Sequence, residues 1–148
     1  MNSQELLELE NELSFQNFAH HDAYKIGQMI VEKVEKEQLK NVRIRIVYHD
    51  DIVFQYLMDG KHGDMWLNRK QKTVETFRHS SYYVFVKNEE THMYQDYQND
   101  ETMVICGGGF PLIVDHEVCG CFVVSGLEHH EDHQLIVDVL KEYMKGDF

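Results

Sequence analysis

The sequence predicts a single α+β domain (α/β in the broad sense), in which helices flank an antiparallel sheet. Residues 42–58 and 110–124 alternate apolar and polar side chains on both sides of a short turn, which is typical of β-hairpins. Residues 21–39 and 129–144 instead repeat apolar residues at every third or fourth position, as amphipathic helices do. Because hairpins dominate and no strand–helix–strand alternation occurs, we expect the strands to pair antiparallel.

No linker or internal repeat divides the chain. Its 148 residues suffice for one hydrophobic core, with residues 1–17 as an N-terminal helical extension of the single domain 1–148. Twenty-six acidic and fourteen basic residues give a net charge of −12, which disfavours nucleic acid and anionic membranes as partners. The N-terminus lacks the basic start of a signal peptide, and no apolar run reaches the roughly 20 residues that span a bilayer. We therefore expect a soluble, cytoplasmic protein.

Two helices are predicted before the first strand, a short one after Ser3 and a longer one from His21 or Asp22 to about Leu39. Their apolar residues recur at helical spacing: Leu6, Leu9 and Leu13 in the first, Ile26, Ile30 and Val34 in the second. The first hairpin then joins strands 42–48 and 52–58. Its first strand presents Val42, Ile44, Ile46 and Tyr48 on one face and Arg43 and Arg45 on the other.

A third helix should begin after Asp64, with Trp66 and Phe77 in the core. Residues 81–87 have strand propensity but follow this helix without a break, so both helix and strand stay open for them. Residues 88–101 are polar and indicate a loop or short helix. Strand-like runs follow at 103–106, 110–114 and 118–124, and the last helix runs from about His129 to Met144. Cys119 and Cys121 should share one strand face as reduced packing residues.

The segment from Cys106 to His133 is the predicted functional region. Gly107, Gly108 and Gly109 lack side chains, so three in a row indicate a special backbone conformation or a close approach. A tight bend alone would also account for them. A glycine loop beside a helix start that carries histidines and carboxylates suits a pocket for a small molecule.

The densest basic segment of this acidic chain includes Arg69 and Lys70, on the third predicted helix. Either of them is a candidate to bind an anionic ligand such as a propionate, carboxylate or phosphate. The alternative is a solvated helix face, paired with local acids such as Glu75.

The start of the last helix offers Asp132 and His133 as a candidate catalytic pair, with His133 as general acid or base and a carboxylate orienting it. His129 and His130, four and three positions before His133, leave a transition-metal site open as an alternative. Acids in the first turn of a helix are also expected from the helix dipole alone, and we predict no metal.

Three blocks resemble the GlcG/HbpS-like superfamily, also called the haem-degrading domain family, and especially its branch of uncharacterised proteins. The blocks are WLNRKQKTVETFRHSSYYV (66–84), GGGFP (107–111), and SGL (125–127) followed by Asp132 and His133. The resemblance runs from about Phe18 onward. It implies a profilin-like fold with an antiparallel sheet of about five strands, helix rather than strand in the region 80–87, homo-oligomers, and haem or a related tetrapyrrole as a candidate ligand or cofactor.

These features support three hypotheses of different classes. The first is a small-ligand-binding protein that takes haem or another anionic small molecule at Gly107–Gly109 and Arg69 or Lys70. The second is an enzyme that acts on a small anionic metabolite or a tetrapyrrole through His133 and Asp132. The third is an oligomeric adaptor or assembly subunit. The first is preferred, because no complete catalytic constellation is present.

Overall fold

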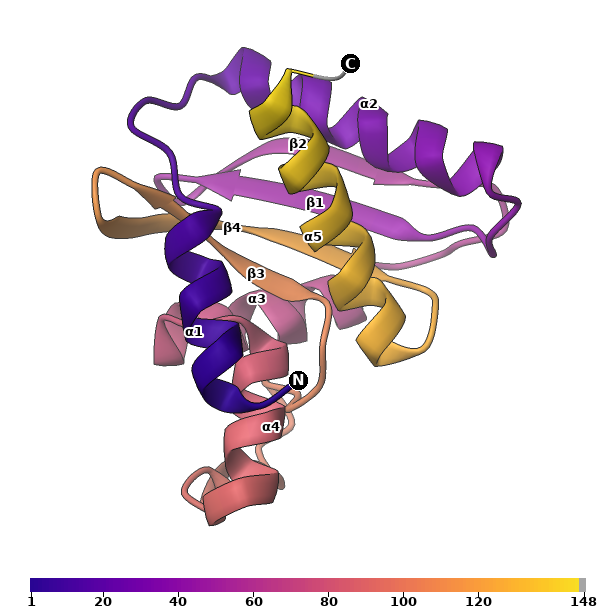
Figure 1. Ribbon diagram of the computed structural model, residues 1–148. Coiled ribbons are helices and arrows are strands. Elements are labelled where there is room, and N and C mark those ends of the chain that lie inside the picture. Colours follow the sequence, from indigo (N-terminus) through magenta and orange to yellow (C-terminus); the bar gives the residue numbers. More distant parts are fainter. Residues whose placement is uncertain (147–148) are drawn as a thin grey trace.

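The computed structural model describes residues 1–146 and contains five α-helices, one 3₁₀-helix and four strands in that part of the chain (Figure 1). In chain order these are α1 (Ser3–Glu12), α2 (His20–Lys36), β1 (Arg43–Tyr48), β2 (Asp51–Leu57), α3 (Met65–Phe77), α4 (Ser81–Thr91), η1 (Gln95–Tyr97), β3 (Gly109–Val114), β4 (Glu117–Ser125) and α5 (His129–Lys145). None of these helices is long and apolar enough to cross a membrane.

The four strands form one antiparallel sheet in the order β2-β1-β4-β3. Both predicted hairpins are present, and β1 and β4 join them at the centre, where Ile44 lies opposite Tyr56 on one side and Val124 on the other. This confirms the predicted α+β class and the antiparallel pairing.

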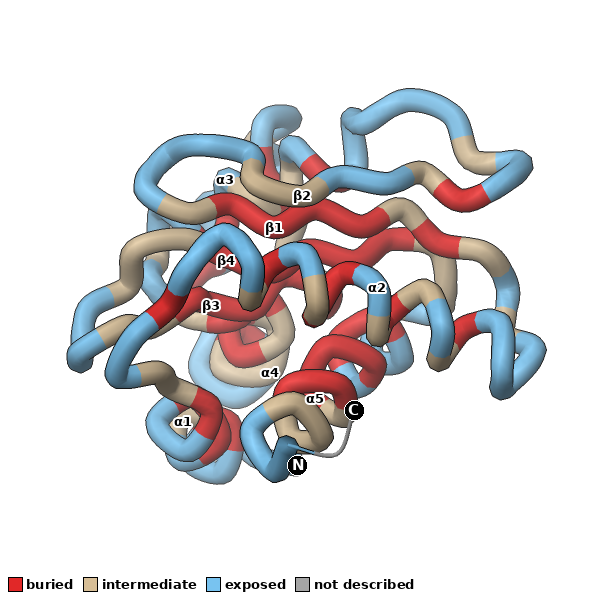
Figure 2. Tube along the Cα trace, turned by 90° about the horizontal axis from the view of Figure 1, so that it is seen from above, coloured by how far each residue is buried: buried red, intermediate tan, exposed pale blue. Residues whose placement is uncertain are grey.

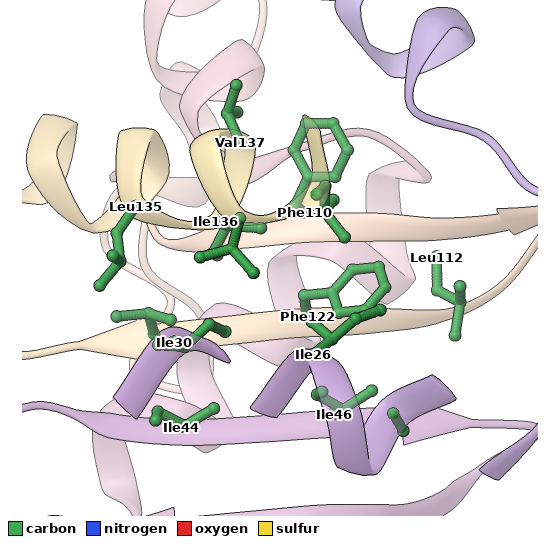
Figure 3. Packing of buried hydrophobic residues seen from close by; sticks show 14 of the residues in the cluster. Ile26, Ile30, Ile44, Ile46, Phe110, Leu112, Phe122, Leu135, Ile136 and Val137 are labelled. Carbon is green, nitrogen blue, oxygen red and sulfur yellow. The ribbon is translucent and has the colours of Figure 1, made fainter. Parts of the chain in front are cut away.

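Helices cover both faces of the sheet. Helices α2 and α5 lie on one face and α3 lies on the other, with α1 and α4 beside the β3 edge (Figures 1 and 2). The main core fills the space between the sheet, α2 and α5, and includes Ile26, Ile30, Ile44, Ile46, Phe110, Phe122, Leu135 and Ile136 (Figure 3). A smaller apolar cluster packs α3 against the other face, and a third joins α1 to α4.

The predicted strand at 103–106 is wrong, which leaves four strands instead of about five. These residues run as a loop along α3, whose side chains take the hydrogen bonds that a strand partner would supply. The Thr73 hydroxyl donates to the Val104 carbonyl at 2.7 Å and accepts from its N–H at 3.2 Å, and Arg69 Nε donates to the Met103 carbonyl at 3.2 Å. Buried backbone groups need such partners, and side chains satisfy them here.

Residues 81–87, for which helix and strand were both left open, form part of helix α4. Ser80 is the N-cap of α4, and its hydroxyl accepts a hydrogen bond from the Tyr83 N–H at 3.0 Å. The Ser80 N–H in turn donates to the Glu10 carboxylate at 3.0 Å, which ties α1 to the start of α4. Capping and tertiary contacts outweigh the strand propensity of this segment.

The prediction that Cys119 and Cys121 share one face is wrong. The register of β3 and β4 shifts between Leu112 and Ile113, which inserts an extra residue at this point of β4. Cys119 therefore packs against the main core, whereas Cys121 packs in the cluster under α3. Both thiols are free, and burial raises the pKa of each.

Candidate functional site

The glycine triplet, the middle of α3, the end of β4 and the start of α5 meet at one place. Lys70 of α3 lies at the centre, 3% exposed. Its ammonium donates to the Val124 carbonyl at 2.9 Å and to the Asp132 carboxylate at 3.0 Å. Asp132 is 1% exposed, so this is a buried ion pair that joins α3 to β4 and α5.

Asp132 also holds the turn between β4 and α5. Its carboxylate accepts hydrogen bonds from the N–H groups of Leu127 at 2.9 Å and Gly126 at 3.4 Å. Burial raises the pKa of Asp132, although Lys70 and these backbone donors lower it. With Lys70 and two N–H groups around it, the carboxylate is fully engaged within the protein.

The glycines allow α3 and α5 to approach the loop closely. Gly108 has φ +122°, and a Cβ there would lie 2.5 Å from both the Lys70 ammonium and the Val124 carbonyl oxygen. A Cβ on Gly107 would overlap the carbonyl oxygen of His129. Gly109 donates its N–H to the Ser81 hydroxyl at 2.9 Å. The triplet therefore serves close packing around Lys70 and His129.

His129, the first residue of α5, is fixed in one tautomer. The Gly107 N–H donates to its Nδ1 at 2.8 Å, so Nδ1 carries the lone pair and the neutral ring carries its proton on Nε2. Burial lowers the pKa of His129, which favours this neutral form. The ring packs edge-on against Phe85, with 4.6 Å between ring centroids. His129 thus presents an N–H donor.

His133 lies deeper and has no polar partner. It is 2% exposed, and neither ring nitrogen has a hydrogen-bond partner among the described residues. Its ring stacks on Tyr82 at 4.8 Å, and burial lowers its pKa to about 4. The hypothesis that a carboxylate orients His133 is therefore wrong for this structure. Consecutive helix residues point about 100° apart, which turns Asp132 toward Lys70 and away from His133.

The two basic candidates, Arg69 and Lys70, occupy different environments in the structure. Lys70 occupies the centre of the site, whereas Arg69 binds the loop at Met103 and places its guanidinium 4.8 Å from the centre of the Trp66 ring. The prediction that Trp66 lies in the core is wrong, because its side chain is 38% exposed. Phe77, the other predicted core aromatic, is half-buried against Tyr94 and Tyr97.

A pocket of about 270 Å³ opens at this place. It is lined by Arg43, Trp66, Lys70, Cys106, Ser125, Gly126, Leu127, His129 and Asp132. Lys70 and Asp132 thus form part of its wall. Gly108 and Gly109 lie close to Lys70, but neither the glycine triplet nor His133 belongs to the lining.

Three polar residues of the wall were not predicted as ligand contacts, namely Arg43, Ser125 and His129. Arg43 belongs to β1, and its Nε and Nη2 donate to the carbonyl oxygens of Gly63 and His62 at 3.0 and 2.8 Å. The sequence signals were present but weak: Arg43 lies on the polar face of its strand, and Ser125 ends another. His129 was considered only as a metal ligand.

No group of three or more His, Cys, Asp or Glu side chains in residues 1–146 could hold a metal ion. His129 and His130 therefore do not combine with Asp132 or Glu131 into a metal site in this arrangement.

Fold and site together define a class of protein, an α+β domain with a polar pocket where the central β4 strand meets a glycine loop. The family model for haem degrading protein HbpS-like matches residues 18–141, and the chain belongs to this family. A UPF0303 protein of Psychromonas ingrahamii is 34% identical over 150 residues, which cover 97% of this chain and 93% of that protein.

Solved structures share the fold. The crystal structure of Ybr137w has a TM-score of 0.88 at 25% identity and covers 99% of this chain and 90% of that chain. PduOC, whose structure is a complex with haem, has a TM-score of 0.68 at 18% identity and covers 84% of this chain and 93% of that chain. The second likeness shows the fold alone.

Proposed function

We propose that this protein binds a small anionic molecule in the pocket between α3, the end of β4 and the start of α5. One observation carries the proposal. The only carboxylate of the wall, Asp132, is neutralised by Lys70 and two backbone N–H groups, while Arg43 has only neutral carbonyl partners. A locally positive pocket in a chain of net charge −12 favours an anion.

Membership of the HbpS-like family and the haem complex of PduOC make haem a candidate ligand. The pocket is better suited to bind the propionate groups of such a molecule than to ligate its iron. Haem iron needs a free axial donor such as a neutral imidazole nitrogen. In this structure His129 Nδ1 is taken by Gly107, its Nε2 carries the proton, and His133 is buried. At about 270 Å³ the pocket is also near the lower end of the ~300–1,000 Å³ typical of ligand sites.

An enzyme is the second candidate function, and one observation favours it. A buried, neutral His133 without a polar partner can accept a proton once a substrate or a conformational change reaches it. Turnover of a tetrapyrrole or small acid that His133→Ala abolishes, with the fold intact, would support this candidate. We rank it second, because His133 does not line the pocket.

A homo-oligomer is also part of the proposal. Strand β2 forms one edge of the sheet and leaves Ile52 51% and Tyr56 45% exposed. Unpaired edges with apolar side chains are usually covered, and a second copy is the simplest cover.

Native mass spectrometry of the purified protein tests the ligand proposal. We expect a retained mass in the unmodified chain that is lost in Trp66→Ala, since Trp66 lines the pocket and is 38% exposed. Tyr24→Ala is the matched control, because Tyr24 is 50% exposed on α2 and does not line the pocket. Equal retention in the two variants would place the ligand elsewhere.

A further inference from the structure

Besides the Trp66 indole and the Cys106 thiol, three side chains of the pocket wall have hydrogen-bond donors without a protein partner among residues 1–146. They come from different elements: Arg43 from β1, Ser125 from the end of β4 and His129 from the start of α5. Every other charged group of the wall is engaged, because Lys70 and Asp132 bind each other. The free donors therefore determine what the pocket can recognise.

Ser125 is the most buried of the three. It is 6% exposed, and its hydroxyl has no hydrogen-bond partner within the described chain. The only fully enclosed polar side-chain atoms without a partner in that part of the chain are the ring nitrogens of His133. The Ser125 hydroxyl is therefore still reachable, and it lines the pocket. A nearly buried hydroxyl that faces a cavity without a partner points to a missing polar group.

His129 contributes a donor of known direction. Because Gly107 holds Nδ1 as the acceptor, the opposite atom of the ring, Nε2, carries the hydrogen. No residue in the range 1–146 accepts that hydrogen. A ligand at this position must therefore supply an acceptor.

Arg43 contributes a fork of donors. Its Nε and Nη2 bind the carbonyl oxygens of His62 and Gly63, which uses one edge of the guanidinium. Nη1 and the outer hydrogen of Nη2 are left, and they form the second edge, which matches the two oxygens of a carboxylate. The bonds to residues 62 and 63 hold the guanidinium in place before any ligand arrives.

Resting on the proposed function, we infer that the pocket selects a monocarboxylate, held by Arg43, Ser125 and His129. Arg43 and Lys70 contribute two positive charges and Asp132 one negative charge, which leaves a single positive charge for the ligand to balance. A dianionic phosphate would leave one negative charge uncompensated in a partly buried site. Trp66 and Leu127 provide apolar surface for the body of the acid.

The fluorescence of Trp66 offers a direct readout, since it is the only tryptophan of the chain and lines the pocket. Benzoate, benzamide and phenyl phosphate have similar rings and differ in charge, so they serve as probes. We expect benzoate to change the emission and to bind at least about tenfold more tightly than either of the other two, because it alone is a monocarboxylate.

Two arginine variants provide a matched pair. Arg43→Met and Arg78→Met both remove one positive charge and side-chain bonds to backbone carbonyls, two carbonyls for Arg43 and one for Arg78, but only Arg43 lines the pocket. We expect benzoate affinity to fall at least about tenfold in Arg43→Met and to stay unchanged in Arg78→Met. Ser125→Ala should weaken benzoate severalfold. It loses no protein hydrogen bond, so it keeps the test valid if Arg43→Met does not fold.

The outcomes separate this inference from the proposed function. If benzamide or phenyl phosphate binds as tightly as benzoate, or if Arg43→Met and Ser125→Ala bind benzoate normally, the monocarboxylate inference is overturned while the pocket stands. If no probe binds and native mass spectrometry finds no retained ligand, both the inference and the proposed function fail.

Protoporphyrin IX and its dimethyl ester identify the source of the carboxylate. If the free acid binds more tightly than the ester and Arg43→Met abolishes this preference, the carboxylate belongs to a tetrapyrrole propionate. If benzoate binds and neither porphyrin does, it belongs to a small free acid, and equally tight binding of the two porphyrins would contradict the inference.

Discussion

The Lys70–Asp132 pair is the residue-scale feature on which the site depends. Removing one partner of a buried pair leaves an uncompensated charge, which costs about 3–5 kcal/mol. We therefore expect Lys70→Met to lower the free energy of unfolding by about this amount in urea denaturation. Lys72→Met, at an exposed position of the same helix, should change it by less than about 0.5 kcal/mol.

A double variant separates charge from packing. Lys70→Met combined with Asp132→Asn removes both charges but keeps an acceptor for the Leu127 N–H. The two losses should then be non-additive, with a coupling of roughly 0.5–3 kcal/mol. Simple additivity, or equal effects of the Lys70 and Lys72 substitutions, would show that the ion pair contributes nothing specific.

His133 makes stability depend on pH. Its pKa is lowered to about 4 by burial, whereas the unfolded chain has the ordinary value of about 6.5. The unfolded state therefore takes up a proton first as the pH falls, and stability is lost between about pH 6.5 and pH 4. The full effect is about 3 kcal/mol, present above the unfolded pKa and absent below the folded one.

His133→Leu should abolish this component. When the unfolding free energies at about pH 7 and about pH 4.5 are compared, the variant should lose about 2 kcal/mol less than the unmodified chain. His130→Leu, at an exposed position of the same helix, serves as the control and should keep the pH dependence. An unchanged dependence in His133→Leu would mean that the ring finds a polar partner in solution.

At the scale of the elements, the pairing of β1 with β4 leaves no room beside Gly120. A Cβ there would overlap the carbonyl oxygen of Val47, which belongs to the backbone and cannot rotate away. We expect Gly120→Ala to cost about 3 kcal/mol or more in urea denaturation.

Gly27→Ala is the matched comparison. The three atoms nearest to a Cβ at Gly27 all belong to the ring of Phe54, a side chain on the edge strand β2, and alanine gains about 1 kcal/mol of helix propensity. The loss should therefore be clearly smaller than for Gly120→Ala. Equal losses would contradict the assignment of a backbone obstacle in the centre of the sheet.

Whether each secondary-structure prediction was right or wrong has a physical reason. Alternation and helical spacing depend on which face is buried, so both hairpins and the long helices could be read from the sequence. Residues 103–106 looked like a strand, because their apolar composition says nothing about hydrogen-bond partners. Thr73 and Arg69, about thirty residues earlier, supply those partners. The faces of Cys119 and Cys121 depend on one inserted residue, which alternation alone does not reveal.

The candidate site could likewise be predicted only in part. Chain reversal through the second hairpin could be predicted, and the structure does place Gly107 beside His129 and Asp132 beside Lys70. The polar strand face that carries Arg43 was a weak signal. Its place in the pocket could not be predicted, because its strand is distant in sequence and the contact depends on the strand order β2-β1-β4-β3. Helical spacing placed Trp66 among the apolar residues that face the core. Its side chain instead lines the pocket, and helical spacing alone does not reveal a pocket.

At the scale of the whole molecule, we expect a homo-oligomer. Light scattering at micromolar concentration should give a multiple of the 17.6 kDa chain mass. Ile52→Lys should lower that mass by placing a charge on the exposed β2 edge, whereas Tyr24→Lys, at an exposed position of α2, should not. A monomeric mass of the unmodified protein would contradict the expectation.

The central claim is that the pocket of Arg43, Lys70, Ser125 and His129 binds an anion. Its most direct test is a crystal structure of the protein with 4-bromobenzoate, whose bromine can be located by anomalous scattering. We predict a bromine peak near Trp66 and carboxylate density facing Arg43, Ser125 and His129. A pocket that contains only water, with bromine absent or located on another surface, would contradict the claim.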